Sequence, residues 1–206
     1  MIYPTDPLGA ESREAAQKAL AAGLAVAIPT DTVYVLAVDP FVPGASDRLF
    51  ELVGRSREQD LAVLVASVWQ ALNLATAVPD AARRVMERCW PGPLTVVLPR
   101  DPEVAADLGD DDLTIGVRMP DHPVPLALCR DVGPLAVATL SAQGEPDFET
   151  AEEVAEEFDE DDVPVVLDGG PCAGGPSSVV DGTGDDLHLI RQGRLPWETI
   201  LEAAGS

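Results

Sequence analysis

The chain has 206 residues, of which 46% are hydrophobic and 4% aromatic, and its formal charge is −23. This length allows one sizeable core built mainly from Ala, Val and Leu. The negative charge disfavours direct nucleic-acid binding, because no basic stripe is present to displace counterions from phosphates. No apolar run approaches the roughly 20 residues that a membrane-spanning helix needs. Met1 to Ala10 also lacks the pattern of a secretory signal, so we expect a cytoplasmic protein.

The cysteine and histidine residues give no metal-binding pattern. Cys89, Cys129 and Cys172 are widely spaced and odd in number, which argues against both a disulfide framework and a cysteine-based metal site. His122 and His188 are isolated in the sequence. We therefore expect no tightly bound metal ion.

Hydrophobic periodicity divides the chain into alternating strands and helices. The first buried strand, Ala25 to Ile28, stops at Pro29 because proline has no N–H to give to a β-ladder. The expected strands are 25–28, 61–66, 94–98, 114–118, 135–140, 163–167, 177–181 and 187–191. The expected helices are 12–22, 43–54, 68–77, 79–89, 123–132, 150–158 and 196–204. No linker divides the chain, so the pattern indicates a mixed α/β sheet in a single domain, residues 1–206.

Hydroxyl and arginine side chains gather at or beside the predicted strand ends, where open α/β sheets usually bind ligands. They are Thr32, Arg55, Arg118, Thr139, Ser141, Ser177 and Arg191. Arginine binds carboxylate or phosphate through two parallel hydrogen bonds, so this set suits a small anionic ligand. The simpler alternative is a surface salt bridge for each arginine and a local turn bond for each hydroxyl. Glycine-rich phosphate loops and nucleophile elbows are absent, so a standard NTPase, dehydrogenase or hydrolase is not indicated.

Five segments follow one another in the order and spacing of a known family's motifs. They are Ile28 to Tyr34 (IPTDTVY), Trp90 to Thr95 (WPGPLT), Val117 to Pro123 (VRMPDHP), Ser177 to Asp181 (SSVVD) and Ile190 to Gly193 (IRQG). In these segments the chain resembles the YrdC-like family over nearly its whole length. The resemblance implies a twisted, mixed open α/β sheet with flanking helices and a concave ligand cavity.

The resemblance also implies an activity, that of a threonylcarbamoyl-AMP synthase. Such an enzyme is a nucleotidyltransferase that joins threonine, bicarbonate and ATP, releases pyrophosphate, and supplies the threonylcarbamoyladenosine modification of tRNA. Mg²⁺ would arrive with ATP as part of the substrate. Other proteins of the pathway would carry out the tRNA step.

Site residues follow from the resemblance by position. Thr32, Thr139 and Ser177 would contact threonine, and Arg118 would pair with its carboxylate. The residues expected at the nucleotide are Arg55, Ser141, Gln143 and Arg191, with Arg55 and Ser141 also expected to act in catalysis.

The chain departs from the family pattern at four positions. Val53 replaces a lysine, Ser56 a proline, Gln143 an asparagine and Val35 a glycine. Losing one charge-assisted hydrogen bond to a phosphate costs roughly 1.5–3 kcal/mol. If the family glycine takes a positive φ, Val35 is strained. If that glycine instead lets the ligand come close to the backbone, the Val35 side chain fills the ligand's space. The alternative function is therefore a paralogue that keeps the fold and part of the threonine pocket but lacks adenylation, and binds a small molecule or a partner.

Overall fold

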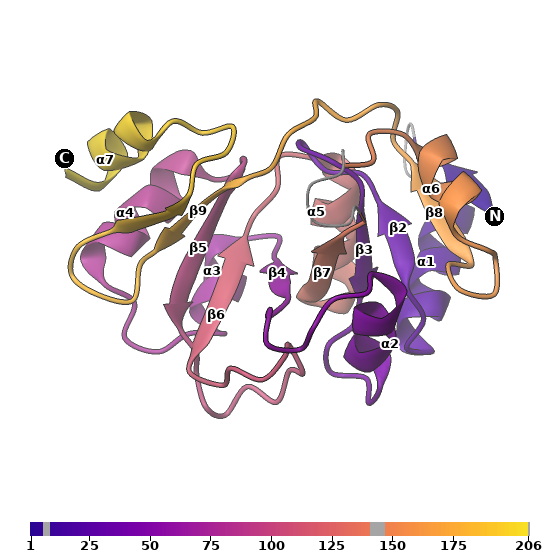
Figure 1. Cartoon of the computed structure of the whole chain (residues 1–206), viewed down its shortest axis with the longest axis horizontal. Coiled ribbons are helices and arrows are strands. Elements are labelled where there is room, and N and C mark those ends of the chain that lie inside the picture. Colours follow the sequence, from indigo (N-terminus) through magenta and orange to yellow (C-terminus); the bar gives the residue numbers. More distant parts are fainter. Residues whose placement is uncertain (6–8, 141–146, 206) are drawn as a thin grey trace.

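The computed structural model describes residues 1–5, 9–140 and 147–205. Its strands form one ten-stranded sheet, which confirms the expected mixed, open α/β architecture. From one edge to the other the strands are β1 (Ile2–Pro4), β8 (Val165–Asp168), β2 (Val26–Ile28), β3 (Val35–Val38), β7 (Leu135–Thr139), β4 (Ala62–Leu64), β6 (Thr114–Arg118), β5 (Leu94–Pro99), β9 (Ser178–Asp181) and β10 (His188–Arg191). Figure 1 shows this order, with the two termini at opposite ends of the sheet.

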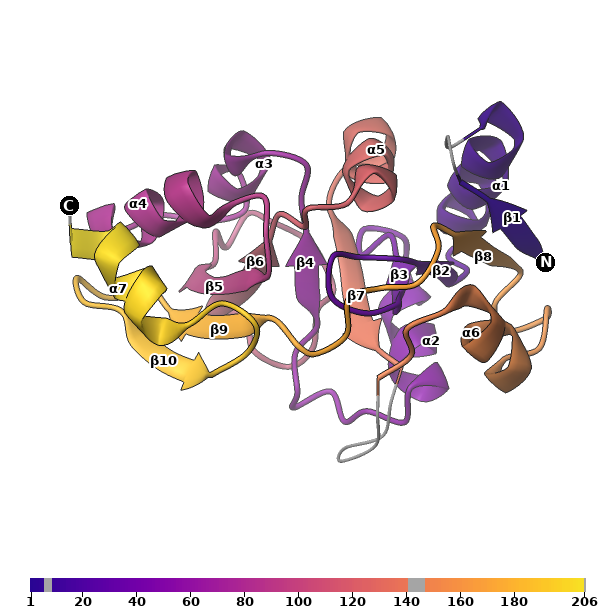
Figure 2. The ribbon, with the colours of Figure 1, turned by 90° about the horizontal axis from the view of Figure 1, so that it is seen from above.

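Seven helices flank the sheet in the described part of the chain. They are α1 (Ala10–Ala21), α2 (Ala45–Leu52), α3 (Val68–Leu72), α4 (Asp80–Cys89), α5 (Pro123–Val132), α6 (Ala151–Glu157) and α7 (Trp197–Gly205). Seen from above, α1, α3, α4 and α5 lie along one side of the sheet, and α2 and α6 lie on the other (Figure 2). None of these described helices is long and apolar enough to cross a membrane.

The central strands consist mainly of apolar residues that are buried in the folded protein. All four residues of β3 are buried, and so are the first four of β7. β7 pairs antiparallel with β3 on one side and with β4 on the other, while β4 and β6 run parallel. Buried backbone polar groups are thus satisfied across the middle of the sheet.

The structure corrects three expectations about elements. The helix expected over 68–77 ends at Leu72, because the residues after it bond to the end of β5. Ala75 forms a β-bridge with Arg100, and the carbonyl of Leu74 accepts a hydrogen bond from Asp101 N at 3.0 Å. Strands β1 and β3, of three and four residues, were not predicted.

Candidate functional site

One face of the central sheet forms the floor of a cavity of about 280 Å³. Residues directly opposite each other in a β-ladder point to the same face. Five such pairs have both members on the cavity wall, namely Val35 with Thr139, Ala62 with Val137, Leu64 with Arg118, Gly116 with Val97, and Thr95 with Val179. The register of five neighbouring strand pairs therefore builds this floor.

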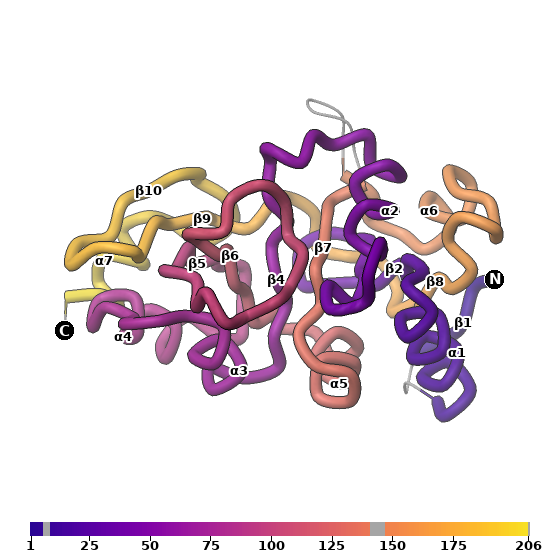
Figure 3. Tube along the Cα trace, turned by 90° about the horizontal axis from the view of Figure 1, so that it is seen from below, coloured from indigo at the N-terminus to yellow at the C-terminus, as the bar shows by residue number. Residues whose placement is uncertain are grey.

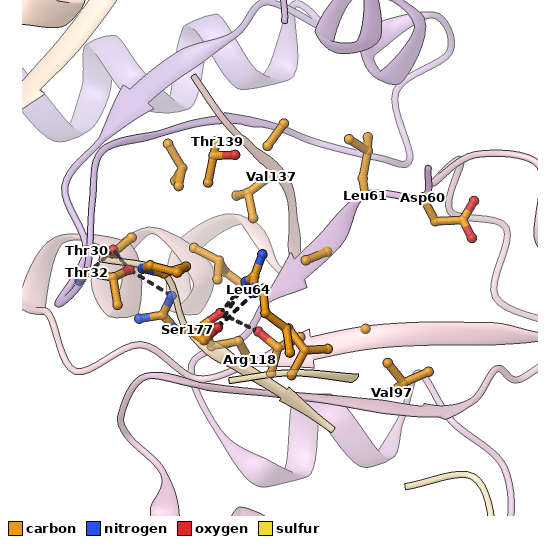
Figure 4. Close-up of a pocket in the computed structure, with 18 of the residues that line it drawn as sticks. Thr30, Thr32, Asp60, Leu61, Leu64, Val97, Arg118, Val137, Thr139 and Ser177 are labelled. Atoms are coloured by element: carbon orange, nitrogen blue, oxygen red, sulfur yellow. Dashed lines mark hydrogen bonds between the residues drawn. The ribbon is translucent and has the colours of Figure 1, made fainter. Parts of the chain in front are cut away.

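The turn between β2 and β3 delivers a hydroxyl group to one end of the cavity. Thr30 organises the turn: its Oγ1 accepts from the backbone N–H groups of Thr32 and Val33, both at 3.1 Å, and donates to Val33 O at 2.7 Å. Thr30 thus makes the local hydrogen bonds of this turn. Thr32 is left to line the cavity (Figure 4).

Thr32 links the turn to the neighbouring arginine. Its Oγ1 lies 2.8 Å from Thr30 Oγ1, and either hydroxyl can donate in this contact. Thr32 Oγ1 also accepts from Arg118 Nη1 at 3.0 Å. The two threonine hydroxyls and Arg118 therefore form one buried hydrogen-bonded group at this end of the cavity.

Arg118 is the buried cation of the site, with 6% of its surface exposed. Its Nη2 bonds to Asp31 Oδ1 at 2.6 Å and its Nε to Gly92 O at 3.2 Å. Burial lowers the pKa of Arg118, and the charge of Asp31 opposes this shift. Since a guanidinium has five N–H donors and three are used by the contacts with Thr32, Asp31 and Gly92, two remain for a ligand. The surface salt bridge considered for each arginine is therefore wrong for Arg118, whose ion pair is buried.

The cavity wall also holds a second hydroxyl pair, which lies beside another arginine. Arg191 donates to the carbonyl of Ser177 from Nε at 3.1 Å and from Nη2 at 3.0 Å, and Nη2 also reaches Ser177 Oγ at 3.3 Å. Ser177 Oγ lies 3.1 Å from Thr95 Oγ1. Whichever of the two hydroxyls donates within this pair, the other keeps one proton that it can give to a ligand.

Arg55 approaches the cavity from the loop after α2. Its Nε is buried and has no hydrogen-bond partner among the residues that the structure describes. Burial lowers the pKa of Arg55, and the positive charge of Arg191 lowers the pKa of both Arg55 and Arg118 further. These three like charges act on one cavity, so an anion bound there would be stabilised by all of them.

Carboxylates limit this positive charge. Asp60 lies at the far end of the cavity from Thr32 and Arg118 (Figure 4). Burial raises the pKa of Asp60, and its Oδ1 accepts from Asp111 N at 3.2 Å. In the described ranges no three His, Cys, Asp or Glu side chains come together as a metal site.

The predicted site residues can now be placed. The structure brings six of them to this one cavity, namely Thr32, Arg55, Arg118, Thr139, Ser177 and Arg191. Ser141 and Gln143 lie outside the described residues. Three wall residues, Thr30, Asp60 and Thr95, were not singled out in the sequence analysis, and neither was Asp31, the partner of Arg118. Asp31 could have been predicted from the sequence as the counterion of Arg118, since a buried arginine needs one and this aspartate stands between Thr30 and Thr32.

Two departures from the family pattern have a clear structural outcome. Val35 lies in β3 with its side chain on the cavity floor. Among the described residues Ala77 is the non-glycine residue with positive φ, so Val35 is not strained by a positive φ and its side chain forms part of the cavity floor. Val53 follows the last residue of α2 and packs against the hydrophobic core. It is not among the residues that line the cavity.

The fold and the cavity together define an α/β-sheet protein with a cavity lined by arginine and hydroxyl side chains. The model of the Sua5/YciO/YrdC family, described as telomere recombination, matches residues 18–193. The chain therefore belongs to this family, and the resemblance in its motifs is confirmed.

Individual relatives agree with this assignment. The threonylcarbamoyl-AMP synthase of Bacillus subtilis is 35% identical over 206 residues, covering 98% of this chain and 59% of the relative. A Mycobacterium tuberculosis protein assigned to the same activity is 39% identical over 190 residues, covering 91% of this chain and 86% of the relative. The crystal structure of Pyrococcus abyssi Sua5 complexed with L-threonine superposes with a TM-score of 0.88 at 33% identity, covering 100% of this chain and 61% of that one. Escherichia coli YciO has the same fold, with a TM-score of 0.83, 24% identity and 94% coverage of both chains.

Proposed function

We propose that the protein is a threonylcarbamoyl-AMP synthase. The observation that carries this proposal is the buried Arg118, joined to Thr32 and facing the same cavity as Arg55 and Arg191. Homology to threonylcarbamoyl-AMP synthases over nearly the whole chain supports it. Threonine, bicarbonate and ATP, the last with its Mg²⁺, would be the substrates.

The hydrogen-bond capacities suggest how threonine would lie. The two uncommitted N–H groups of Arg118 would meet the threonine carboxylate. Thr32 Oγ1 would accept a hydrogen bond from the ligand's nitrogen or hydroxyl. The pair of Thr95 and Ser177 would donate its one free hydroxyl proton to a ligand oxygen.

The reaction requires little covalent participation from the protein. Threonine nitrogen adds to bicarbonate with loss of water to give a carbamate. A carbamate oxygen then attacks the α-phosphate of ATP, the bond to the β-phosphate oxygen breaks, and pyrophosphate leaves. Catalysis is then positioning plus stabilisation of charge on phosphoryl oxygens, which we assign to Arg55 and Arg191. Ser141 and Gln143 complete the proposed nucleotide-side set.

Calorimetry with paired variants tests the threonine site. The wild type should bind threonine, and Thr32→Ser should retain that affinity because serine keeps the acceptor oxygen. Thr32→Val should weaken binding about tenfold, since it leaves a ligand donor unpaired. Equal affinities for the Ser and Val variants would contradict the role of Thr32, and no threonine binding at millimolar ligand would overturn the proposal.

A paralogue without adenylation activity is the second candidate. Val53 favours it, because this position supplies an apolar side chain to the core instead of a cation to phosphate. Pyrophosphate release that requires both threonine and bicarbonate decides between the two functions. A variant with Val53→Lys and Gln143→Asn should gain this release if those two positions cause a defect. Threonine binding without release, in both the wild type and this variant, would support the paralogue.

A further inference from the structure

A second hollow lies at the other ends of the central strands. It is an open groove of about 490 Å³, here called the Trp69 groove, and its wall includes Phe41, Trp69, Leu74, Glu103, Val104 and Pro134. Val35 and Thr139 stand at the cavity ends of β3 and β7, whereas Phe41 follows β3 and Pro134 precedes β7. Among the described residues, the groove and the cavity share no lining residue. Figure 3 shows the molecule from below, with α3 and the connection from β5 to β6 in view.

The groove exposes large aromatic side chains. Trp69 is 70% exposed and Phe41 47% exposed, although both are residue types that a folded chain normally covers. Trp and other aromatic side chains are enriched where proteins bind one another, because they bury a large area at little cost in conformational entropy. This apolar surface is thus suited to covering by another polypeptide.

The wall of the groove is held in place before any partner binds. Gln70 Oε1 accepts from Ala66 N at 2.6 Å, and its Nε2 donates to Cys129 O at 2.8 Å. Ser67 caps α3 by accepting from Gln70 N at 3.1 Å. Trp69 therefore projects from a fixed turn of helix, which lowers the ordering cost of binding.

One carboxylate lines the groove, and two more bond to the backbone of groove residues. Glu103 lines the groove, Asp101 Oδ1 accepts from Glu103 N at 2.9 Å, and Asp39 Oδ1 accepts from Phe41 N at 2.9 Å. Within the described ranges, no cationic group lies within 4 Å of these three carboxylates.

Ion pairs are made elsewhere in the described ranges. Arg57 is shared by Asp47, Asp107 and Asp110, and Arg100 pairs with Asp112. Asp39, Asp101 and Glu103 are therefore available to a cationic partner.

We propose that the Trp69 groove docks an extended, basic segment of a partner protein. One apolar side chain of the segment would lie against Trp69 and Phe41, and flanking Lys or Arg residues would meet Asp39, Asp101 and Glu103. A second copy of this chain does not fit the groove, because an isologous contact places acidic rim against acidic rim and each copy carries a charge of −23. A partner bound here leaves the cavity at the opposite strand ends open.

Selection from a phage-displayed library of random 12-residue peptides tests the proposal. The full-length protein is the bait, and the enriched peptides should carry an aromatic or aliphatic residue flanked by Lys or Arg. Their affinity should fall about tenfold or more in Trp69→Ala and several-fold in Glu103→Gln. Leu113→Ala and Glu87→Gln, which alter an exposed leucine and an exposed glutamate outside the groove, should bind as the wild type does.

Independent readouts keep the result unambiguous. Amide chemical-shift changes on peptide addition should cluster at 39–41, 69–74 and 101–105, while the melting temperature and cavity-ligand binding of Trp69→Ala stay as in the wild type. Enrichment of acidic peptides, equal binding by Trp69→Ala, or no enrichment at all would overturn the proposal. Sedimentation showing a dimer that Trp69→Ala dissociates would replace the partner with a second copy.

Discussion

At the scale of single residues, the ion pair of Arg118 and Asp31 is the most consequential contact. Only 7% of the Arg118 side chain and 14% of the Asp31 side chain is exposed. Removing both charges from water is costly, so each ion depends on the other for compensation. Asp31 also accepts from Asp121 N at 3.1 Å, which ties the turn after β2 to the segment before α5.

Asp31→Asn should therefore destabilise the protein by roughly 3 kcal/mol, because it leaves the Arg118 charge buried without a counterion. Urea unfolding of both proteins at neutral pH measures the difference. Asp47→Asn is the matched control. Asp47 is exposed and its partner Arg57 also pairs with Asp107, so the loss there should stay below about 1 kcal/mol. Equal losses in the two variants would show that burial of the Arg118 pair has no energetic weight.

At the scale of elements, the hairpin of β9 and β10 sets the position of Ser177. Gly193 follows β10, and a Cβ added to it would lie 2.3 Å from the carbonyl carbon of Ser177 and 2.4 Å from the carbonyl oxygen of Pro176. Two hydrogen bonds reinforce this close approach. Gly193 N donates to Ser178 Oγ at 2.9 Å, and Arg194 N donates to Pro176 O at 3.0 Å. The glycine allows the chain after β10 to press against the cavity wall.

Gly193→Ala should separate these backbone segments and displace Ser177 and Arg191 together. We expect a stability loss of about 2 kcal/mol or more and weakened binding of any cavity ligand. Thermal unfolding and ligand calorimetry measure the two effects. Gly184→Ala in the same hairpin is the control, because its Cβ would meet nothing nearer than 4.0 Å. If both variants behave alike, the close contact at Gly193 is not what fixes this wall.

The start of α5 contains a titratable cap. His122 Nδ1 accepts from Val124 N at 3.3 Å, so the imidazole must be neutral at that nitrogen. Burial lowers the pKa of His122 below its ordinary value of 6.5, although Asp31 and Asp121 oppose the shift. Stability from this group is therefore present above pH 6.5 and is lost as the pH falls, because the unfolded chain takes up the proton first.

His122→Asn should remove this part of the pH dependence, since asparagine caps a helix without titrating in this range. Urea midpoints of the variant and the wild type, measured at about pH 7.5 and about pH 5.5, give the comparison. The wild type should lose more stability on acidification than the variant. An identical loss in both proteins would mean that the cap does not sense pH.

At the scale of the whole molecule, 36 acidic residues face 13 basic ones. Arg118 in the cavity and Arg57 in the loop after α2 are paired with carboxylates, and the excess negative charge is left to repel itself. Self-repulsion destabilises a compact state, and salt screens it over a Debye length.

Raising NaCl from about 0.05 M to about 0.5 M should stabilise the protein by about 1 kcal/mol, which corresponds to roughly 3 °C in melting temperature for a chain of this size. Differential scanning calorimetry measures the shift. KCl should act equally, because screening depends on ionic strength. A melting temperature that falls or stays constant with salt would show that charge repulsion does not limit stability.

Much of the fold followed from sequence patterns. Strand 114–118 and helix 123–132 were predicted with the bounds that the structure has, because alternation and an N-terminal proline are strong local signals. The strand after the threonine turn was missed, since Val35 to Val38 is uniformly apolar and only its pairing with β2 and β7 makes it a strand. Helix α3 was predicted too long because the bonds from Leu74 and Ala75 to the end of β5 join segments distant in sequence.

The sequence by itself determined the chemistry available: arginines and hydroxyls near strand ends, an acidic surface, and the motifs of the Sua5/YciO/YrdC family. Tertiary structure alone decided which of these groups act together. Arg118 meets Asp31 across 87 positions and Thr95 meets Ser177 across 82, distances that no local pattern encodes. The tertiary structure also decided that Val35 lines the cavity without a positive φ, because this depends on sheet register. It left Trp69 exposed, because no other element of the described chain covers that surface.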